Sequence, residues 1–95
     1  VRLPRGETSV RISNNESDFY SIIDIVSTDR PGFLFQVTRT LADAGIDIVM
    51  SRASTRAHRV RDSFYVTDGG EKLLDESRLQ EIREQLLGSI RALEA

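Results

Sequence analysis

The chain has 95 residues, of which 39% are hydrophobic and 29% charged, so it supports one folded domain with a single modest core rather than a disordered segment. Its formal net charge of -2 argues against nucleic-acid binding, which needs a basic surface. The absence of cysteine excludes disulfides and thiolate metal sites, and no apolar run approaches the roughly 18 residues of a membrane span.

The N-terminal third is expected to contain a linker and then a β-hairpin. Residues 1–9 carry no apolar leader segment and are interpreted as a linker remnant of a longer protein, so that residues 10–95 form the domain. Residues 10–13 are a short β-branched stretch, and residues 14–18 are turn formers. The Ile- and Val-rich residues 19–27 predict a second strand. Its alternation assigns one face to the core, namely Phe19, Ile23 and Ile25.

A helix is predicted after a sharp turn at residues 28–32. Pro31 suits the first helical turn, where its missing N–H needs no partner, and Gly45 stands where a left-handed residue commonly ends a helix. Between them, over residues 33–44, apolar residues recur at helical spacing. The buried stripe of this helix is expected to comprise Leu34, Val37, Leu41 and Ala44.

The second half of the chain predicts a hairpin followed by a helix. Residues 46–55 and 60–67 have strand patterns and are joined by the polar residues 56–59. In the first of these strands, one face would carry Ile46, Ile48 and Met50, and in the second strand Phe64 and Val66 would face inward. Residues 76–93 predict a helix with Asp75 as its N-cap. Its buried stripe would consist of Leu79, Ile82, Leu86, Ile90 and Leu93.

The element order ββαββα indicates an α+β, ferredoxin-like two-layer sandwich, with two helices on one face of a four-stranded antiparallel sheet. In the usual order a last strand follows the second helix, and no such segment follows here. We therefore expect residues 10–13 to replace that strand by pairing with residues 19–27. The connection through the first helix to residues 46–55 would skip one sheet position, which residues 60–67 would fill.

The polar residues form no constellation for catalysis or metal binding. The single histidine, His58, is surrounded by arginines and lacks the partners that a metal site or a catalytic triad requires. No Gly-rich phosphate loop is present. We therefore expect no cofactor and no enzymatic activity in this chain. The arginines within residues 52–61 leave two interpretations open, edge protection with a gain in solubility or a docking patch for an acidic partner surface.

The turn at residues 28–34 is the candidate binding site. The first N–H groups of the following helix lack backbone partners and can bind a carboxylate, helped by the helix dipole. Gly32 would let a ligand or a neighbouring chain approach the backbone, and Asp29 could receive an ammonium group. These are the two charged ends of an amino acid. The alternative is a plain strand-to-helix turn with Asp29 near the cap.

Four blocks of sequence, in this order, resemble the ACT domain family. They are TDRPGFL at residues 28–34, LADAGIDI at residues 41–48, RAST at residues 52–55 and DSFYVTD at residues 62–68. Within that family the chain is similar to the C-terminal ACT domains of bifunctional enzymes that add uridylyl groups to the PII nitrogen-signalling protein and remove them. The similarity extends over residues 10–93.

This resemblance implies a cytoplasmic regulatory domain that pairs side by side with another ACT domain and binds an amino acid, which is glutamine in those enzymes. The resemblance also implies PII as a possible partner, through a parent enzyme that is a nucleotidyltransferase. It implies neither nucleic acid nor a membrane as a partner. The implied ligand site consists of Asp29, Arg30, Gly32, Phe33 and Leu34, with Ile46, Asp47 and Ile48 supplied by the paired domain. Two alternatives stay open: an ACT module that only pairs subunits or docks PII, and an amino-acid-sensing ACT domain of another metabolic enzyme.

Overall fold

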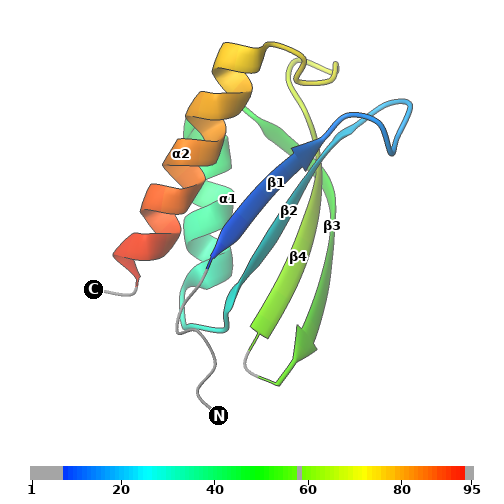
Figure 1. Cartoon of the computed structure of the whole chain (residues 1–95). Coiled ribbons are helices and arrows are strands. Elements are labelled where there is room, and N and C mark those ends of the chain that lie inside the picture. The colour runs from blue at the N-terminus through cyan, green and yellow to red at the C-terminus, as the bar shows by residue number, and fades with distance from the viewer. Residues whose placement is uncertain (1–7, 58, 94–95) are drawn as a thin grey trace.

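Four strands form one antiparallel sheet, and both helices lie on the same face of it (Figure 1). The structure, a computed structural model, describes residues 8–57 and 59–93. The elements along the chain are β1 (Ser9–Ser13), β2 (Ser21–Thr28), α1 (Phe33–Asp43), β3 (Asp47–Arg56), β4 (Arg59–Thr67) and α2 (Glu76–Ala92). The strand order across the sheet is β1-β2-β4-β3.

The expected N-terminal replacement strand is confirmed. β1 pairs antiparallel with β2 at the sheet edge, with Val10 opposite Ile25. The connection from β2 through α1 to β3 skips one position in the sheet, and β4 fills that position, as predicted. Residues 1–7 of the expected linker lie outside the described residues, and β1 begins at Ser9. The chain therefore has the predicted ferredoxin-like sandwich with a rearranged edge.

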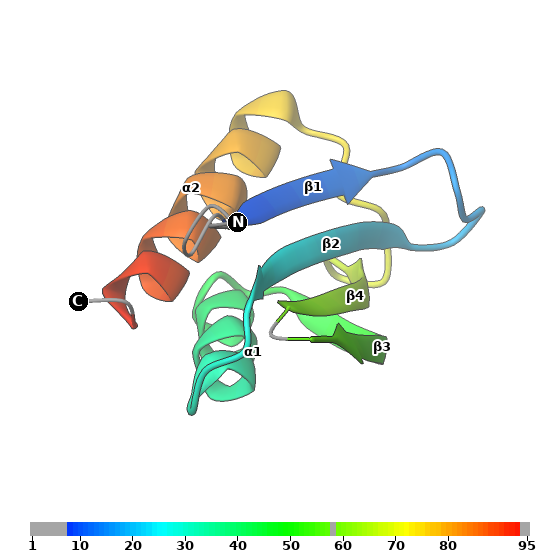
Figure 2. The same ribbon diagram turned by 60° about the horizontal axis from the view of Figure 1, so that its bottom comes forward.

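The core lies between the inner face of the sheet and the two helices (Figure 2). The central strands and both helices contribute its fully buried side chains, which are Ile23, Ile25, Val37, Leu41, Phe64, Val66, Ile82, Leu86 and Ile90. In α2 the predicted stripe is correct, since Leu79 and Leu93 pack against the same core. Asp75 caps this helix, because its side chain accepts a hydrogen bond from the N–H of Ser77.

The expected core position of Phe19 is wrong. This side chain is 73% exposed and precedes β2, which begins at Ser21. The hydroxyl of Ser17 accepts hydrogen bonds from the N–H groups of Phe19 and Tyr20, so both residues belong to the turn. Ile22 lies on the face of β2 opposite to Ile23 and Ile25 and is nevertheless buried, with Tyr65 beside it on the neighbouring strand.

The predicted stripe of α1 needs one correction. Leu34 is 55% exposed, whereas its neighbour Phe33 is buried. The helix begins at Phe33, and residues four apart share a face, so the buried face runs through Phe33, Val37 and Leu41. Leu34 is rotated by about 100° from that face, because an α-helix has about 3.6 residues per turn. It therefore points away from the core.

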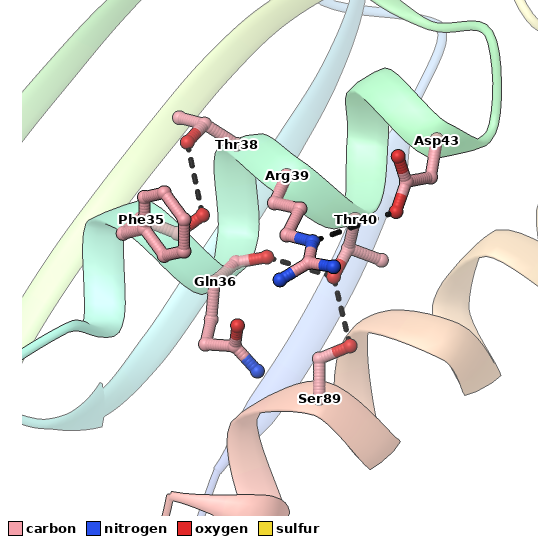
Figure 3. Close-up of polar contacts among 7 residues, drawn as sticks. All are labelled: Phe35, Gln36, Thr38, Arg39, Thr40, Asp43 and Ser89. Atoms are coloured by element: carbon pink, nitrogen blue, oxygen red, sulfur yellow. Dashed lines mark hydrogen bonds and ion pairs between the residues drawn. The ribbon is translucent and has the colours of Figure 1, made fainter.

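A polar contact joins the two helices (Figure 3). The hydroxyl of Thr40 is hydrogen-bonded to the Gln36 carbonyl oxygen at 2.7 Å and to the hydroxyl of Ser89 at 2.8 Å. The nearby ion pair between Arg39 and Asp43 is exposed and spans 3.8 Å, so it adds little stability. The hydroxyl pair thus fixes the C-terminal half of α1 against α2.

Candidate functional site

An open groove lies between the start of α1 and the inner face of β3 and β4. Its volume of about 450 Å³ falls within the range of small-molecule sites. The groove exists because β3 is the far edge of the sheet, and nearly all of its residues are exposed. It is lined by Asp29, Arg30, Gly32, Phe33, Leu34, Phe35, Ser51, Ala53, Val60 and Asp62.

The turn before α1 presents backbone donors at this groove. Gly32 is the N-cap and has a φ of 81°, a left-handed conformation that other residues adopt only with strain. No side chain among the described residues caps this helix end. The first helical bond runs from the N–H of Gln36 to the carbonyl of Gly32 at 2.9 Å, so the N–H groups of Leu34 and Phe35 precede the helical ladder. They are suited to an anionic acceptor.

The rim of the groove is apolar. The side chains of Leu34 and Phe35 are both more than half exposed, and Phe33 lies beside them with its ring in the core. Such side chains can cover the methylene groups of a small ligand. The apolar surface therefore adjoins the backbone donors described above.

The lining of the groove includes a largely buried aspartate. Asp62 is 5% exposed and lies on the inner face of β4, between Val60 and Phe64. Burial raises the pKa of Asp62, and the negative charge of Asp29 raises it further. Arg30 also lines the groove, and its Nε is buried with no hydrogen-bond partner in the part of the chain that the structure describes.

Five of the predicted site residues lie together in this groove: Asp29, Arg30, Gly32, Phe33 and Leu34. Ile46, Asp47 and Ile48 follow the opposite end of α1 and do not line it. Ile46 is buried in the core, and its N–H donates to the carbonyl of Leu41 at 2.9 Å. The side chain of Asp47 is exposed. That these three residues act in a paired domain stays a prediction.

Sequence reasoning missed half of the lining residues: Phe35, Ser51, Ala53, Val60 and Asp62. Asp62 had a signal, because a carboxylate interrupts the inward apolar series of β4. Ser51 had none, because a β-bulge between Ile48 and Met50 reverses the alternation of β3. Met50 consequently pairs with Tyr65 on the outer face, and Ser51 faces inward.

The arginines of the hairpin lie on the other side of the sheet. The strand register places Arg52, Arg56, Arg59 and Arg61 on the outer face, with Arg56 opposite Arg59. None of the four forms an ion pair within residues 8–57 and 59–93. His58 lies outside the described residues. The patch is not part of the groove.

A second hollow of about 340 Å³ lies between the helices and is lined by Thr40, Asp43, Ala44, Gln85, Gly88 and Ser89. Its one ionisable residue, Asp43, is already paired with Arg39. In the described parts of the chain, no group of three or more His, Cys, Asp or Glu side chains could hold a metal ion. None of the helices described is long and apolar enough to cross a membrane.

Comparison with known proteins identifies the family to which the chain belongs. Residues 20–88 match the ACT domain. A bifunctional uridylyltransferase/uridylyl-removing enzyme of Rhodospirillum rubrum is 44% identical over 82 residues, which are 85% of this chain and 9% of that enzyme. The enzymes of the same name from Rhodopseudomonas palustris and Azospirillum brasilense are 42% identical over 62 residues and 38% identical over 82 residues. These matches cover 65% and 85% of this chain and 7% and 9% of the two enzymes.

The chain thus spans less than a tenth of the length of these relatives. The family match begins just before β2 and extends into α2, so it includes the turn, both walls of the groove and the helices around them. On this match and on the sandwich of four strands and two helices, the chain belongs to the ACT domain family.

Proposed function

We propose that this ACT domain senses an amino acid, glutamine, for a cytoplasmic bifunctional uridylyltransferase/uridylyl-removing enzyme that acts on PII. The observation that carries the proposal is the groove at the start of α1, which combines backbone donors, carboxylates and an apolar rim. The similarity to three enzymes of that name supports the choice of parent protein.

The groove offers complementary chemistry to both ends of a zwitterion. The N–H groups of Leu34 and Phe35 and the dipole of α1 favour a carboxylate. Asp29, on the exposed side of the turn, attracts the ammonium group. The apolar rim covers the aliphatic part of the ligand. The groove therefore favours small zwitterions over anions such as keto acids.

Regulation follows if the ligand binds one arrangement of paired domains better than another. A ligand shifts such an equilibrium only by its difference in affinity for the two states. The groove is lined in part by Ser51 and Ala53 of β3, the exposed edge strand at which a second domain would complete its wall. Glutamine would then bias the parent enzyme between uridylyl transfer and uridylyl removal.

Calorimetry with L-glutamine tests the proposal on this chain and on its Asp29→Asn variant. We expect saturable heat with the wild type and an affinity lower by about two- to fivefold in the variant, because an exposed ion pair contributes about 1 kcal/mol or less. Asp43→Asn is the matched control, since Asp43 lies at the other end of α1 and outside the groove. It should bind as the wild type does.

The proposal fails if neither glutamine nor another amino acid produces heat at concentrations well above physiological levels. A second function would then hold, that of a module which only pairs subunits or docks PII. The observation that favours it is the long edge strand β3, on which Val49 and Met50 are about half exposed. A chain that binds no amino acid but sediments as a dimer would have this second function.

A further inference from the structure

Asp62 lines the groove without a partner for its carboxylate. The residue is only 5% exposed, and within residues 8–57 and 59–93 its side chain has neither a hydrogen bond nor an ion pair. Its oxygen atoms are not among the fully buried unpartnered atoms of those residues, so they are accessible from the groove. Buried carboxylates in folded proteins are ordinarily hydrogen-bonded or paired, because an unpaired buried charge is costly. An unpaired one in the floor of a groove therefore points to a group that comes from outside the domain.

The elements around Asp62 explain why the fold supplies no partner. Its cross-strand neighbours are Ile25 on β2 and Ala53 on β3, and neither side chain can donate a hydrogen bond. The residues of α1 that line the groove are Phe33, Leu34 and Phe35, which are uncharged. Among the described residues, the other charged groups that line the groove are Asp29 and Arg30, and both belong to the turn.

The turn residues do not satisfy this carboxylate. Asp29 carries the same charge and repels it. Arg30 has the opposite charge, but its Nε is itself buried and without a partner among the described residues. The lining of the groove thus includes a carboxylate and a guanidinium Nε that have no hydrogen-bond partner among the described residues.

We propose that Asp62 is the specificity-determining residue that receives the ammonium group of the ligand. The Nε of Arg30 then donates a hydrogen bond to an oxygen atom of the ligand. This inference rests on the proposed function of the groove as an amino-acid site. Asp62 differs from Asp29 in being largely buried, and a charge-assisted hydrogen bond is stronger where less water surrounds it. The exposed Asp29 attracts the ammonium group, whereas Asp62 selects ligands that carry one.

Binding of the ligand is coupled to the loss of a proton from Asp62. Burial and the charge of Asp29 raise the pKa of Asp62, so the free domain holds a proton there at a higher pH than an ordinary aspartate does. A bound ammonium group favours the ionised form and lowers this pKa. The ligand must therefore displace a proton at any pH below the pKa of the free domain, and its affinity falls as the pH falls through that value.

The test compares the wild type, Asp62→Asn and the control Asp24→Asn with two probes, L-glutamine and glutaramate, its analogue without the amino group. Asn keeps the shape of Asp and removes the charge. We expect Asp62→Asn to weaken glutamine binding by about 10- to 100-fold, the usual value of a hydrogen bond to a charged group, and to leave the weak binding of glutaramate unchanged or stronger. Asp24 lies on the opposite face of the sheet, where it accepts a hydrogen bond from Ser63, so Asp24→Asn should bind as the wild type does.

A measurement on the wild type removes any dependence on how the variant folds. Carboxyl NMR titration of Asp62 should show a pKa that falls when the domain is saturated with glutamine. A pKa that stays unchanged on saturation contradicts the inference, as does glutamine binding of equal strength in a folded Asp62→Asn variant. Either result leaves the proposed function in place.

Two further outcomes separate the claims. If the wild type binds a different amino acid and Asp62→Asn loses it, the role of Asp62 holds and glutamine is the wrong effector. If the wild type binds no compound with an ammonium group, both the inference and the proposed function are overturned.

Discussion

Replacing Phe64 with alanine is expected to lower the free energy of unfolding by about 3–5 kcal/mol. Phe64 is the largest fully buried side chain and lies on the central strand β4, in the core that the sheet and the helices share. Its truncation removes apolar contacts and leaves a cavity that a close-packed core fills only in part. A domain of this size has a total stability of about 5–14 kcal/mol, so the loss is a large share of the whole.

Phe19→Ala is the matched control for this substitution, because it removes the same atoms from a side chain that is 73% exposed. Its effect should stay below about 1 kcal/mol. Urea denaturation of both variants, monitored by circular dichroism, gives the two values. Equal losses would show that Phe19 belongs to the core, as its sequence position first indicated, and would contradict the structure.

Replacing Leu41 with alanine is expected to cost about 2–5 kcal/mol of unfolding free energy. Leu41 is fully buried on α1, one turn beyond Val37, and packs in the core between the sheet and the helices. Its carbonyl oxygen also accepts the N–H of Ile46, so the end of the helix and the following loop depend on its position. Denaturant titration at matched conditions measures the loss.

Leu34→Ala tests whether Leu34 belongs to the buried stripe of α1, as sequence periodicity predicted, or lines the groove. Leu34 is exposed at the groove, so its truncation should cost less than about 1 kcal/mol in stability while weakening the binding of an amino acid. The reverse result, a large loss of stability with unchanged binding, would mean that the helix is rotated relative to the structure.

Periodicity and topology rules were sufficient to predict the fold. The alternation in β4 and the helical spacing in α2 each identified the correct inward side chains, because both elements are regular from end to end. The edge position beside β2 was predicted to be filled by an N-terminal strand, and the pairing of Val10 with Ile25 confirms it. Two errors arose where an element begins, since Phe19 and Leu34 each lie within two residues of a strand or helix start. A third arose at the bulge in β3, which moves Met50 to the opposite face from Ile48.

The groove was predictable on one side only. Asp29, Gly32 and Leu34 lie near the start of α1 in the sequence. They can be predicted because the first N–H groups of a helix lack backbone partners. Ser51 and Asp62 are brought to the groove by strand pairing, and a bulge determines which side of β3 faces it. Local patterns do not encode a one-residue change of register, so the opposite wall required the three-dimensional structure.

Amide NMR during a titration with L-glutamine tests most directly whether the groove is the ligand site. Shifts should concentrate on residues at both of its walls, Gly32 and Leu34 at the turn and Ser51 and Asp62 in the sheet. Gly88, in the hollow between the helices, should not shift. Shifts confined to that hollow, or a spectrum unchanged at saturating glutamine, would contradict the account.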